Sequence, residues 1–230
     1  VLTSKAVESD ALLACVKRLV FLSTIKVLGE ATEGRPFGHG DPVAPDDPYY
    51  VSKCEAEDAV RSICTGSATD FVILRPPLIC GPGVGGNLQR VFSLVHRGLP
   101  VPLASVRNAR AMVALDNLVD VIALSLKHPN ASGETLLVAD DEALSTPDLF
   151  RIVARSMGKR GRLLPMPVMM LRAAGVLLRK SAEIDRLCGD LEIDISHTKQ
   201  VLDWGPRVTP AESLRAAVEY FRLHYGERID

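Results

Sequence analysis

The sequence predicts an α/β protein, with a parallel sheet in its first part and mostly helices in its second. Short apolar runs at 18–23 and 71–76 alternate with segments whose apolar residues recur at helical spacing. This alternation is typical of buried parallel strands joined by helices. After residue 140, strand signals give way to helices with strong start signals. The 230 residues suffice for one large domain, or for a domain with a smaller lobe.

Strands are expected at "RLVFLS" (18–23) and "FVILRP" (71–76), with weaker patterns at "MVAL" (112–115) and "ETLLVA" (134–139). Helical spacing marks "SKAVESDALLACVK", "YYVSKCEAEDAVRSI", "NLQRVFSLVHRG" and "DNLVDVIALSLKH". Two later helices carry capping signals, in "STPDLFRIVARSMG" and in "TPAESLRAAVEYFRLHYG". Gly98 and Gly158 stand where helices end.

The most apolar long stretch is "LLPMPVMMLRAAGVLL" (163–178). It contains two prolines and an arginine and is too short to span a bilayer. We expect a buried helix here, and the alternative is a helix that lies in a membrane interface.

Composition narrows the class of protein. The net charge of −1 gives no sign of a nucleic-acid-binding protein or an acidic tail. The five cysteines form no CxxC pair, which favours a cytoplasmic chain with reduced thiols. The histidines (39, 96, 128, 197 and 224) show no metal-ligand spacing, so no metal is expected. Trp204 in "LDWGP" is expected to anchor the core.

"DDPYYVSK" (46–53) places Tyr49 four residues before Lys53. On a helix these side chains share one face, and a nearby ammonium favours the phenolate form of a tyrosine. Such a tyrosine can exchange protons near neutral pH, although an ordinary exposed helix start fits the spacing alone. Ser23 and Thr24 supply hydroxyls at the end of a strand, where open α/β sheets bind ligands. Tyr50 has no lysine at this spacing and is expected to pack or to line the site.

Four motifs together resemble a known family. They are "FLST…VLG", "PYYVSK…E", "RPPLICGPG" and "RNARAMVALDNLVDVI", and "DISHTKQVLDWGPRVTPAESLRAAVEYF" is similar to the same family's closing segment. The chain resembles the extended short-chain dehydrogenase/reductase family, in particular NAD-dependent nucleotide-sugar epimerases and dehydratases of the UDP-glucose 4-epimerase type. The resemblance implies part of a Rossmann-like sheet at 1–80. It also implies a substrate-binding lobe at 81–230, interleaved with returning elements at 111–127.

The resemblance assigns roles to individual residues. Tyr49 would exchange a proton with a sugar hydroxyl, Thr24 would hydrogen-bond the same oxygen, and Lys53 would hold the nicotinamide ribose and support the phenolate. The implied NAD-binding residues, with NADP as a possible cofactor, are Ser23, Tyr49, Lys53, Pro76 and Leu78. The implied contacts to a nucleotide sugar, expected to be UDP-linked, come from Thr24, Lys26, Asn87 and Arg110. For Lys26 and Arg110, a solvated surface role is the alternative.

"GPGVGG" (81–86) fits the dinucleotide-binding glycine pattern G-x-G-x-x-G. We reject that role because Pro76, Pro77 and Pro82 interrupt the unit and no acidic residue follows about 20 positions later. The resemblance instead places these glycines near the substrate diphosphate. The sequence departs from the family pattern at three positions. Relatives often have tyrosine in place of Cys80, histidine in place of Ala114 and asparagine in place of Leu78.

The family's glycine-rich turn has no counterpart in this sequence. We therefore expect an upstream segment of roughly a hundred residues, or a partner that covers the edge of the 18–23 strand. The family also implies a homodimer built from helices 3–16 and 48–64, with Leu12, Leu13, Val60 and Ile63 in contact. The alternative is that these side chains only cover the sheet. The expected activity is epimerisation or 4-keto reduction of a nucleotide sugar, and the competing hypothesis is a catalytically silent, ligand-binding remnant.

Overall fold

The computed structural model describes residues 16–45 and 47–225. Its main sheet has three parallel strands in the order β1-β2-β5, formed by β1 (Arg18–Leu22), β2 (Asp70–Arg75) and β5 (Thr135–Leu137). Leu22 pairs with Leu74, and Leu74 pairs with Leu136. The predicted parallel α/β architecture is confirmed, and the four predicted strands are present with shifted ends.

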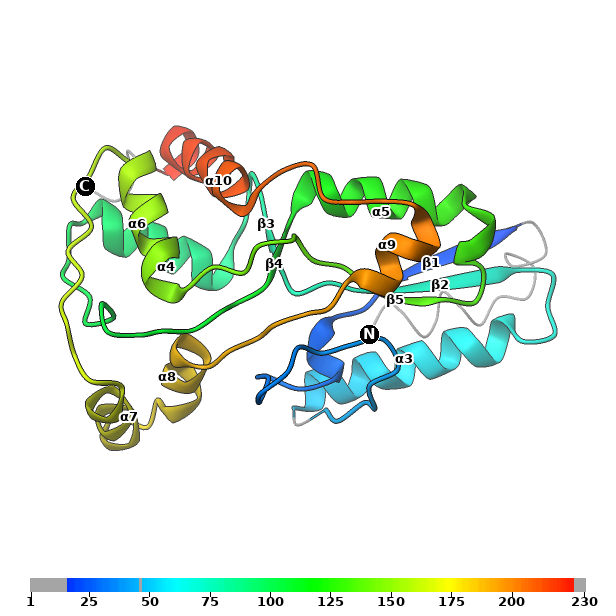
Figure 1. The fold of residues 1–230 in the computed structure, drawn as a ribbon, viewed down its shortest axis with the longest axis horizontal. Helices are drawn as coiled ribbons and strands as arrows, with labels where there is room; N and C mark the ends of the chain where they lie inside the picture. Colours follow the sequence, from blue (N-terminus) through cyan, green and yellow to red (C-terminus); the bar gives the residue numbers. More distant parts are fainter. Residues whose placement is uncertain (1–15, 46, 226–230) are drawn as a thin grey trace.

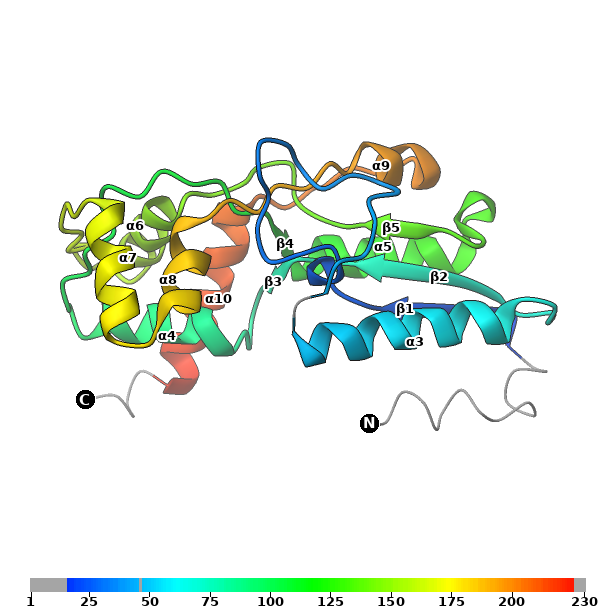
Figure 2. The same cartoon turned by 90° about the horizontal axis from the view of Figure 1, so that it is seen from below.

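Helices cover both faces of this sheet (Figures 1 and 2). On one face α3 (Pro48–Cys64) packs Val60 against Ile73. On the other face α5 (Leu115–Lys127) and α9 (Ser196–Leu202) pack with Val72 and Leu74. Neighbouring side chains of a strand point to opposite faces. A strand that is apolar at successive positions is therefore buried on both sides.

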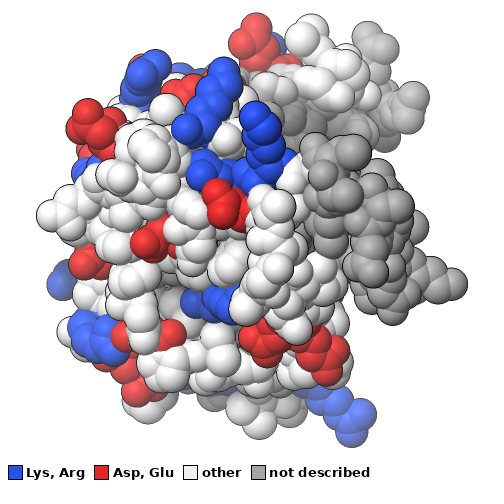
Figure 3. All heavy atoms as spheres, turned by 90° about the vertical axis from the view of Figure 1, so that its right-hand side faces the viewer, with Lys and Arg blue, Asp and Glu red and all other residues white. Residues whose placement is uncertain are grey.

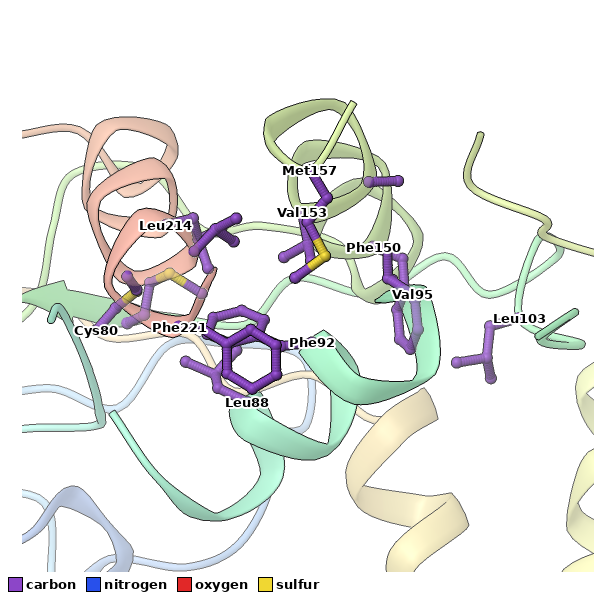
Figure 4. Close-up of a cluster of buried hydrophobic side chains, with 14 of the residues drawn as sticks. Cys80, Leu88, Phe92, Val95, Leu103, Phe150, Val153, Met157, Leu214 and Phe221 are labelled. Carbon is purple, nitrogen blue, oxygen red and sulfur yellow. The ribbon is translucent and has the colours of Figure 1, made fainter. Parts of the chain in front are cut away.

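A second, two-stranded parallel sheet pairs β3 (Leu78–Cys80) with β4 (Met112–Ala114). It leads into a lobe of helices α4 (Gly86–His96), α6 (Thr146–Ser156), α7 (Val168–Leu177), α8 (Ser181–Cys188) and α10 (Pro210–Tyr225). Two short 3-10 turns, η1 (Ile25–Val27) and η2 (Pro129–Ala131), complete the elements named in the described residues. The core of this lobe forms where α4, α6 and α10 meet, and Phe92 packs edge-on against Phe221 (Figure 4).

The predicted helix ends agree with the structure. Gly98 follows α4 with φ of 64°, and Gly158 follows α6 with φ of 65°, a left-handed conformation that glycine adopts without strain. Trp204 is buried in the core, as predicted. The helix expected before residue 17 lies outside the described residues.

The apolar stretch 163–178 differs from its expectation. Pro165 and Pro167 delay the helix, so that α7 begins only at Val168. Within α7 only Leu171 and Gly175 are buried. The prediction of a buried helix is therefore wrong. In the described part of the chain, no helix is both long and apolar enough to cross a membrane.

One of the predicted dimer contacts, Val60, disagrees with the structure. Val60 is only 2% exposed and packs with Phe21, Cys64 and Ile73, so it covers the sheet and cannot contact a partner. Leu12 and Leu13 lie outside the described residues. In the described chain β1 pairs only with β2, and Leu22 is exposed, so β1 is an edge strand there.

Candidate active site

The carboxyl ends of β1 and β2 stay paired beyond the strands themselves. The Ser23 amide donates to the Leu74 carbonyl at 2.8 Å, and the Ile25 amide donates to the Pro76 carbonyl at 2.9 Å. Ser23 and Pro76 are both buried at this edge of the sheet. The hydroxyl of Thr24 accepts from the Lys26 amide at 3.4 Å and caps η1. The structure thus brings together the residues that sequence reasoning placed at two strand ends.

Tyr49 and Lys53 lie on the first turns of α3. Asp47 caps the helix, accepting from the Tyr49 amide at 2.8 Å. The Lys53 ammonium donates to the Leu22 carbonyl at 3.3 Å and lies 6.0 Å from the centre of the Tyr49 ring. The Tyr49 side chain is 59% exposed. The Lys53 ammonium therefore lies between the exposed Tyr49 ring and the carboxyl end of β1.

Tyr50 has a different environment from its neighbour. It is only 9% exposed, and its hydroxyl accepts from the Lys26 ammonium at 2.8 Å. Burial raises the pKa of Tyr50, and its hydrogen bond to Glu30 raises it further. The hydrogen bond to Lys26 lowers the pKa but does not cancel these effects. The prediction that Tyr50 packs or lines the site agrees with this geometry.

Glu30 joins the two parts of the molecule. Its carboxylate accepts from the Lys26 ammonium at 2.9 Å and, on its other oxygen, from the Arg186 guanidinium of α8. Burial by itself would raise the pKa of Glu30, but hydrogen bonds from Lys26, Arg186 and Tyr50 outweigh it and lower the pKa to about 2. Glu30 is therefore ionised at neutral pH. Lys26 is paired rather than freely solvated.

Arg110 lies close to this cluster. Its guanidinium donates to the Gly189 carbonyl at 3.1 Å. Burial lowers the pKa of Arg110, while the charges of Glu30 and Asp190 raise it. The alternative of an ordinary surface arginine does not describe this half-buried side chain. Lys26 and Arg186 therefore bind the Glu30 carboxylate directly, and Arg110 lies near enough to feel its charge.

The other predicted ligand-binding residues lie farther along the chain. Leu78 opens β3 and is exposed, as is Asn87 in the first turn of α4. Gly83 and Gly86 have φ of 79° and 64°, so the "GPGVGG" loop uses backbone conformations that favour glycine. A side chain at Gly81 would meet Leu115, since its Cβ would lie 2.7 Å from the Leu115 Cβ. The loop ends at the N-terminus of α4, which has no side-chain cap, and the first amides of a helix have no partner within the helix.

A buried ion pair fixes α3 against the sheet. The Arg75 guanidinium donates to both oxygens of Glu57, at 3.0 and 2.6 Å, and Glu57 is 1% exposed. Burial by itself would raise the pKa of Glu57, but hydrogen bonds from Arg75 and Ser23 and the charges of Arg75 and Arg61 together lower it. The pair holds the helix that carries Tyr49 and Lys53 in a fixed position relative to β2.

Sequence reasoning missed Glu30 and Arg186. The spacing of Lys26 and Glu30 by four residues was a usable signal for a pair, whereas Arg186 is 156 residues away in sequence. It also missed Asp140, whose buried carboxylate accepts from the Ala114 amide at 3.0 Å and from Asn117 at 2.7 Å. Asp140 thereby satisfies donors at the start of α5.

Cys80 and Ala114, two residues that differ from the family pattern, both lie in the protein interior. Cys80 is fully buried, and burial raises the pKa of its thiol to about 11, so the thiol stays protonated at neutral pH. Ala114 is also buried, at the junction of β4 and α5. Neither side chain is exposed beside Tyr49.

One cluster of possible metal ligands forms although the sequence spacing gave no sign of it. His39, Glu134 and His197 bring their ligand atoms within 4.8 Å of one another. The His197 Nε2 atom lies 2.9 Å from a carboxylate oxygen of Glu134. The His197 ring also stacks on the His39 ring, with 3.6 Å between the ring centroids. Stacked imidazoles direct their lone pairs along parallel planes, so one ring would have to turn before both could bind one ion. The arrangement as it stands is a stacked and hydrogen-bonded contact between a loop residue (His39), the residue before β5 (Glu134) and α9 (His197).

Comparison with known proteins identifies the family of this chain. Residues 7–139 match the family described as "NAD dependent epimerase/dehydratase family". The chain is 39% identical over 222 residues to a UDP-glucose 4-epimerase of Vibrio cholerae, which covers 96% of this chain and 66% of that protein.

Solved structures show the same fold. A UDP-glucuronic acid 4-epimerase of Bacillus cereus in complex with NAD superimposes with a TM-score of 0.73 at 18% identity, covering 90% of this chain and 62% of that chain. A UDP-glucose 4-epimerase of Thermotoga maritima with UDP-glucose gives a TM-score of 0.72 at 22% identity, covering 96% and 67%. The chain thus spans about two thirds of the length of these relatives. The matched family, the relative at 39% identity and the shared fold agree, and the chain belongs to the NAD-dependent epimerase/dehydratase family.

Proposed function

We propose that this chain forms part of an NAD-dependent nucleotide-sugar epimerase or 4-ketoreductase that uses Tyr49 as its acid and base. The observation that carries the proposal is the position of Lys53, which contacts the last carbonyl of β1 and lies beside the Tyr49 ring. Thr24 follows that carbonyl by two residues. An exposed phenol, a cation and a hydroxyl therefore gather at the carboxyl end of parallel strands, where this class of fold binds ligands.

The cofactor fits the same edge of the sheet. We propose that Ser23, Pro76 and Leu78 line the nicotinamide side and that Lys53 binds the ribose. Leu78 is exposed. The Ser23 amide donates to the Leu74 carbonyl and the Ile25 amide donates to the Pro76 carbonyl, so Ser23 and Pro76 lie at the paired ends of β1 and β2. Both observations support this assignment. NAD is the cofactor of a structural relative, and NADPH is bound in another. When bound, the nicotinamide supplies the acceptor and donor for the hydride of the sugar carbon.

The residues of this chain would handle the proton. Tyr49 removes the proton of the sugar hydroxyl while the carbon is oxidised to a ketone, and it returns a proton when the ketone is reduced. Lys53 stabilises the phenolate form during the first of these steps. Thr24 orients the oxygen by a hydrogen bond. In a 4-ketoreductase only the second step would be needed, with Tyr49 donating the proton.

The substrate is proposed to be UDP-linked. Two similar proteins are a UDP-glucose 4-epimerase and a UDP-glucuronic acid 4-epimerase in complex with UDP-glucuronic acid. Arg110 and the amides at the start of α4 offer positive charge and donors suited to a diphosphate. Lys26 and Asn87 would contact the substrate from the two sides of the site.

The purified protein should be incubated with NAD and either UDP-glucose or UDP-N-acetylglucosamine, and the products followed by proton NMR. Formation of the C4 epimer supports the epimerase. Reduction of a UDP-4-keto sugar with NADH, without epimerisation, supports the ketoreductase. Absence of turnover with all three substrates, together with UDP-sugar binding by calorimetry, would support the silent binding protein instead.

A further inference from the structure

Helix α7 carries apolar side chains both on its buried side and on its exposed side. On one side Leu171 and Gly175 are buried against α8, and a Cβ at Gly175 would lie 2.9 Å from the Ile184 Cγ1 atom. On the other side large apolar side chains face solvent, with Met169 exposed by 80% and Leu177 by 85%. The close packing at Gly175 fixes this side of α7 against α8.

The exposed side chains form one continuous surface. At about 100° per residue, the exposed positions cover an arc of roughly 160° on the side opposite Leu171 and Gly175. This arc, called the α7 apolar arc below, consists of Met169, Met170, Ala173, Ala174, Val176 and Leu177. A helix that is apolar around most of its circumference is normally buried by something. In the described structure nothing buries this arc.

The chain segment that contains the arc is basic. Residues 159–180 contain six cationic side chains and no acidic one. The cations are Lys159, Arg160, Arg162, Arg172, Arg179 and Lys180, and all six are exposed.

Arg172 and Lys180 pair with carboxylates of the neighbouring helix α8. Arg160, Arg162 and Arg179 form no ion pair within the described residues. By contrast, the opposite end of the molecule carries acidic and basic side chains interspersed (Figure 3). The segment 159–180 that contains the apolar arc is therefore basic, and the carboxylates paired with it, Glu183 and Asp185, belong to α8.

We propose that α7 and its flanking cations bind the surface of an anionic phospholipid bilayer. The apolar arc would lie in the boundary between headgroups and acyl chains, and Arg160, Arg162 and Arg179 would contact lipid phosphates. Figures 1 and 2 both place α7 at the outer end of the helical lobe, remote from the main sheet. A flat surface can therefore approach the arc without meeting β1, β2 or β5.

The charges favour a bilayer over a second copy of the chain. A two-fold interface through α7 would place the same patch on both subunits. The six cations of 159–180 outnumber the two α8 carboxylates paired with them, so the same net positive charge would face itself around an apolar centre, which is unfavourable. An anionic lipid surface satisfies the apolar arc and the cations together. This inference does not depend on the proposed catalytic function.

The test is flotation of the purified protein with lipid vesicles. One set is pure phosphatidylcholine, and the other is an equimolar mixture of phosphatidylcholine and phosphatidylglycerol. We expect binding to the mixed vesicles that weakens with added salt. Leu177→Ser should weaken it by about tenfold, and the double replacement of Arg160 and Arg179 by glutamine by about tenfold or more.

The matched control is Leu223→Ser, which replaces a leucine of α10 that is 77% exposed and should leave binding unchanged. Absence of binding to mixed vesicles, equal binding to both vesicle types, or an equal loss in the Leu223 variant would each overturn the proposal. Sedimentation provides a further outcome. If Leu177→Ser dissociates a dimer while vesicles have no effect, the arc binds a second copy, and the lipid proposal is wrong.

Discussion

Replacing Glu30 by glutamine should lower the free energy of unfolding, and the size of this loss should depend on pH. The carboxylate holds Lys26 on one side and Arg186 of α8 on the other, so it connects the sheet-bearing part of the chain with the helical lobe. Glutamine keeps the shape of the side chain but removes its charge. The two cations then lose their ionic partner.

The magnitude follows from the pKa. Hydrogen bonds from Lys26, Arg186 and Tyr50 outweigh burial and lower the pKa of Glu30 from 4.5 to about 2. Such a difference is equivalent to about 3 kcal/mol of preference for the folded carboxylate at neutral pH. Because the Lys26 and Arg186 side chains are 25% and 38% exposed, solvent screens the pairing. We therefore expect a loss of about 1.5 kcal/mol in the free energy of unfolding.

The sign of the pH dependence is fixed by the direction of the shift. The folded pKa lies below the unfolded one, so the stabilisation is present above about pH 4.5 and is lost as the pH falls towards about 2. The difference between the two proteins should shrink to about 0.5 kcal/mol near pH 3. Urea unfolding at several pH values measures it, and Glu33→Gln at an exposed position is the matched control. A difference that stays constant with pH would refute the reasoning.

Three further substitutions test the fold. Glu57→Gln should cost about 3 kcal/mol in the free energy of unfolding because it leaves Arg75 without its buried partner, whereas Asp58→Asn on the same helix should cost less than about 0.5. Similar losses in the two variants would count against the buried pair. Phe92→Ala should cost about 4 kcal/mol, since Phe92 is fully buried, and a loss below about 1 would contradict the packing. Gly98→Ala should cost about 1 kcal/mol through backbone strain alone, because no atom lies within 4 Å of the added Cβ; an unchanged urea midpoint would refute it.

Local patterns in the sequence were sufficient for the main elements. The apolar runs at β1 and β2 predicted strands, and the cap residues before α6 and α10 predicted helix starts, because both signals act within a few residues. The three-residue strand β3 escaped prediction because it directly follows Pro76 and Pro77. Its strand conformation depends on pairing with β4, more than thirty residues later.

The arrangement of the candidate site was predictable where its residues lie at short spacing in the sequence. Tyr49 and Lys53 are neighbours on one helix face, and Ser23 and Thr24 follow one strand. The pairing of Glu30 with Arg186 depends on how the two parts of the chain meet, which local patterns do not encode. The burial of α7 was wrongly predicted for a related reason. Apolar composition shows that a helix needs an apolar environment, but it does not show whether the same chain supplies it.

The most direct test of the proposed chemistry compares two single-atom changes at adjacent positions. Tyr49→Phe and Tyr50→Phe each remove one hydroxyl and keep the ring. We expect Tyr49→Phe to lower kcat about 10² to 10⁴ fold with little change in UDP-sugar binding. Tyr50→Phe should leave kcat nearly unchanged, because its hydroxyl is engaged with Lys26. Steady-state kinetics with NAD and the preferred UDP-sugar decide the question. An unchanged kcat for Tyr49→Phe, or an equal loss in both variants, would contradict the assignment of Tyr49 as acid and base.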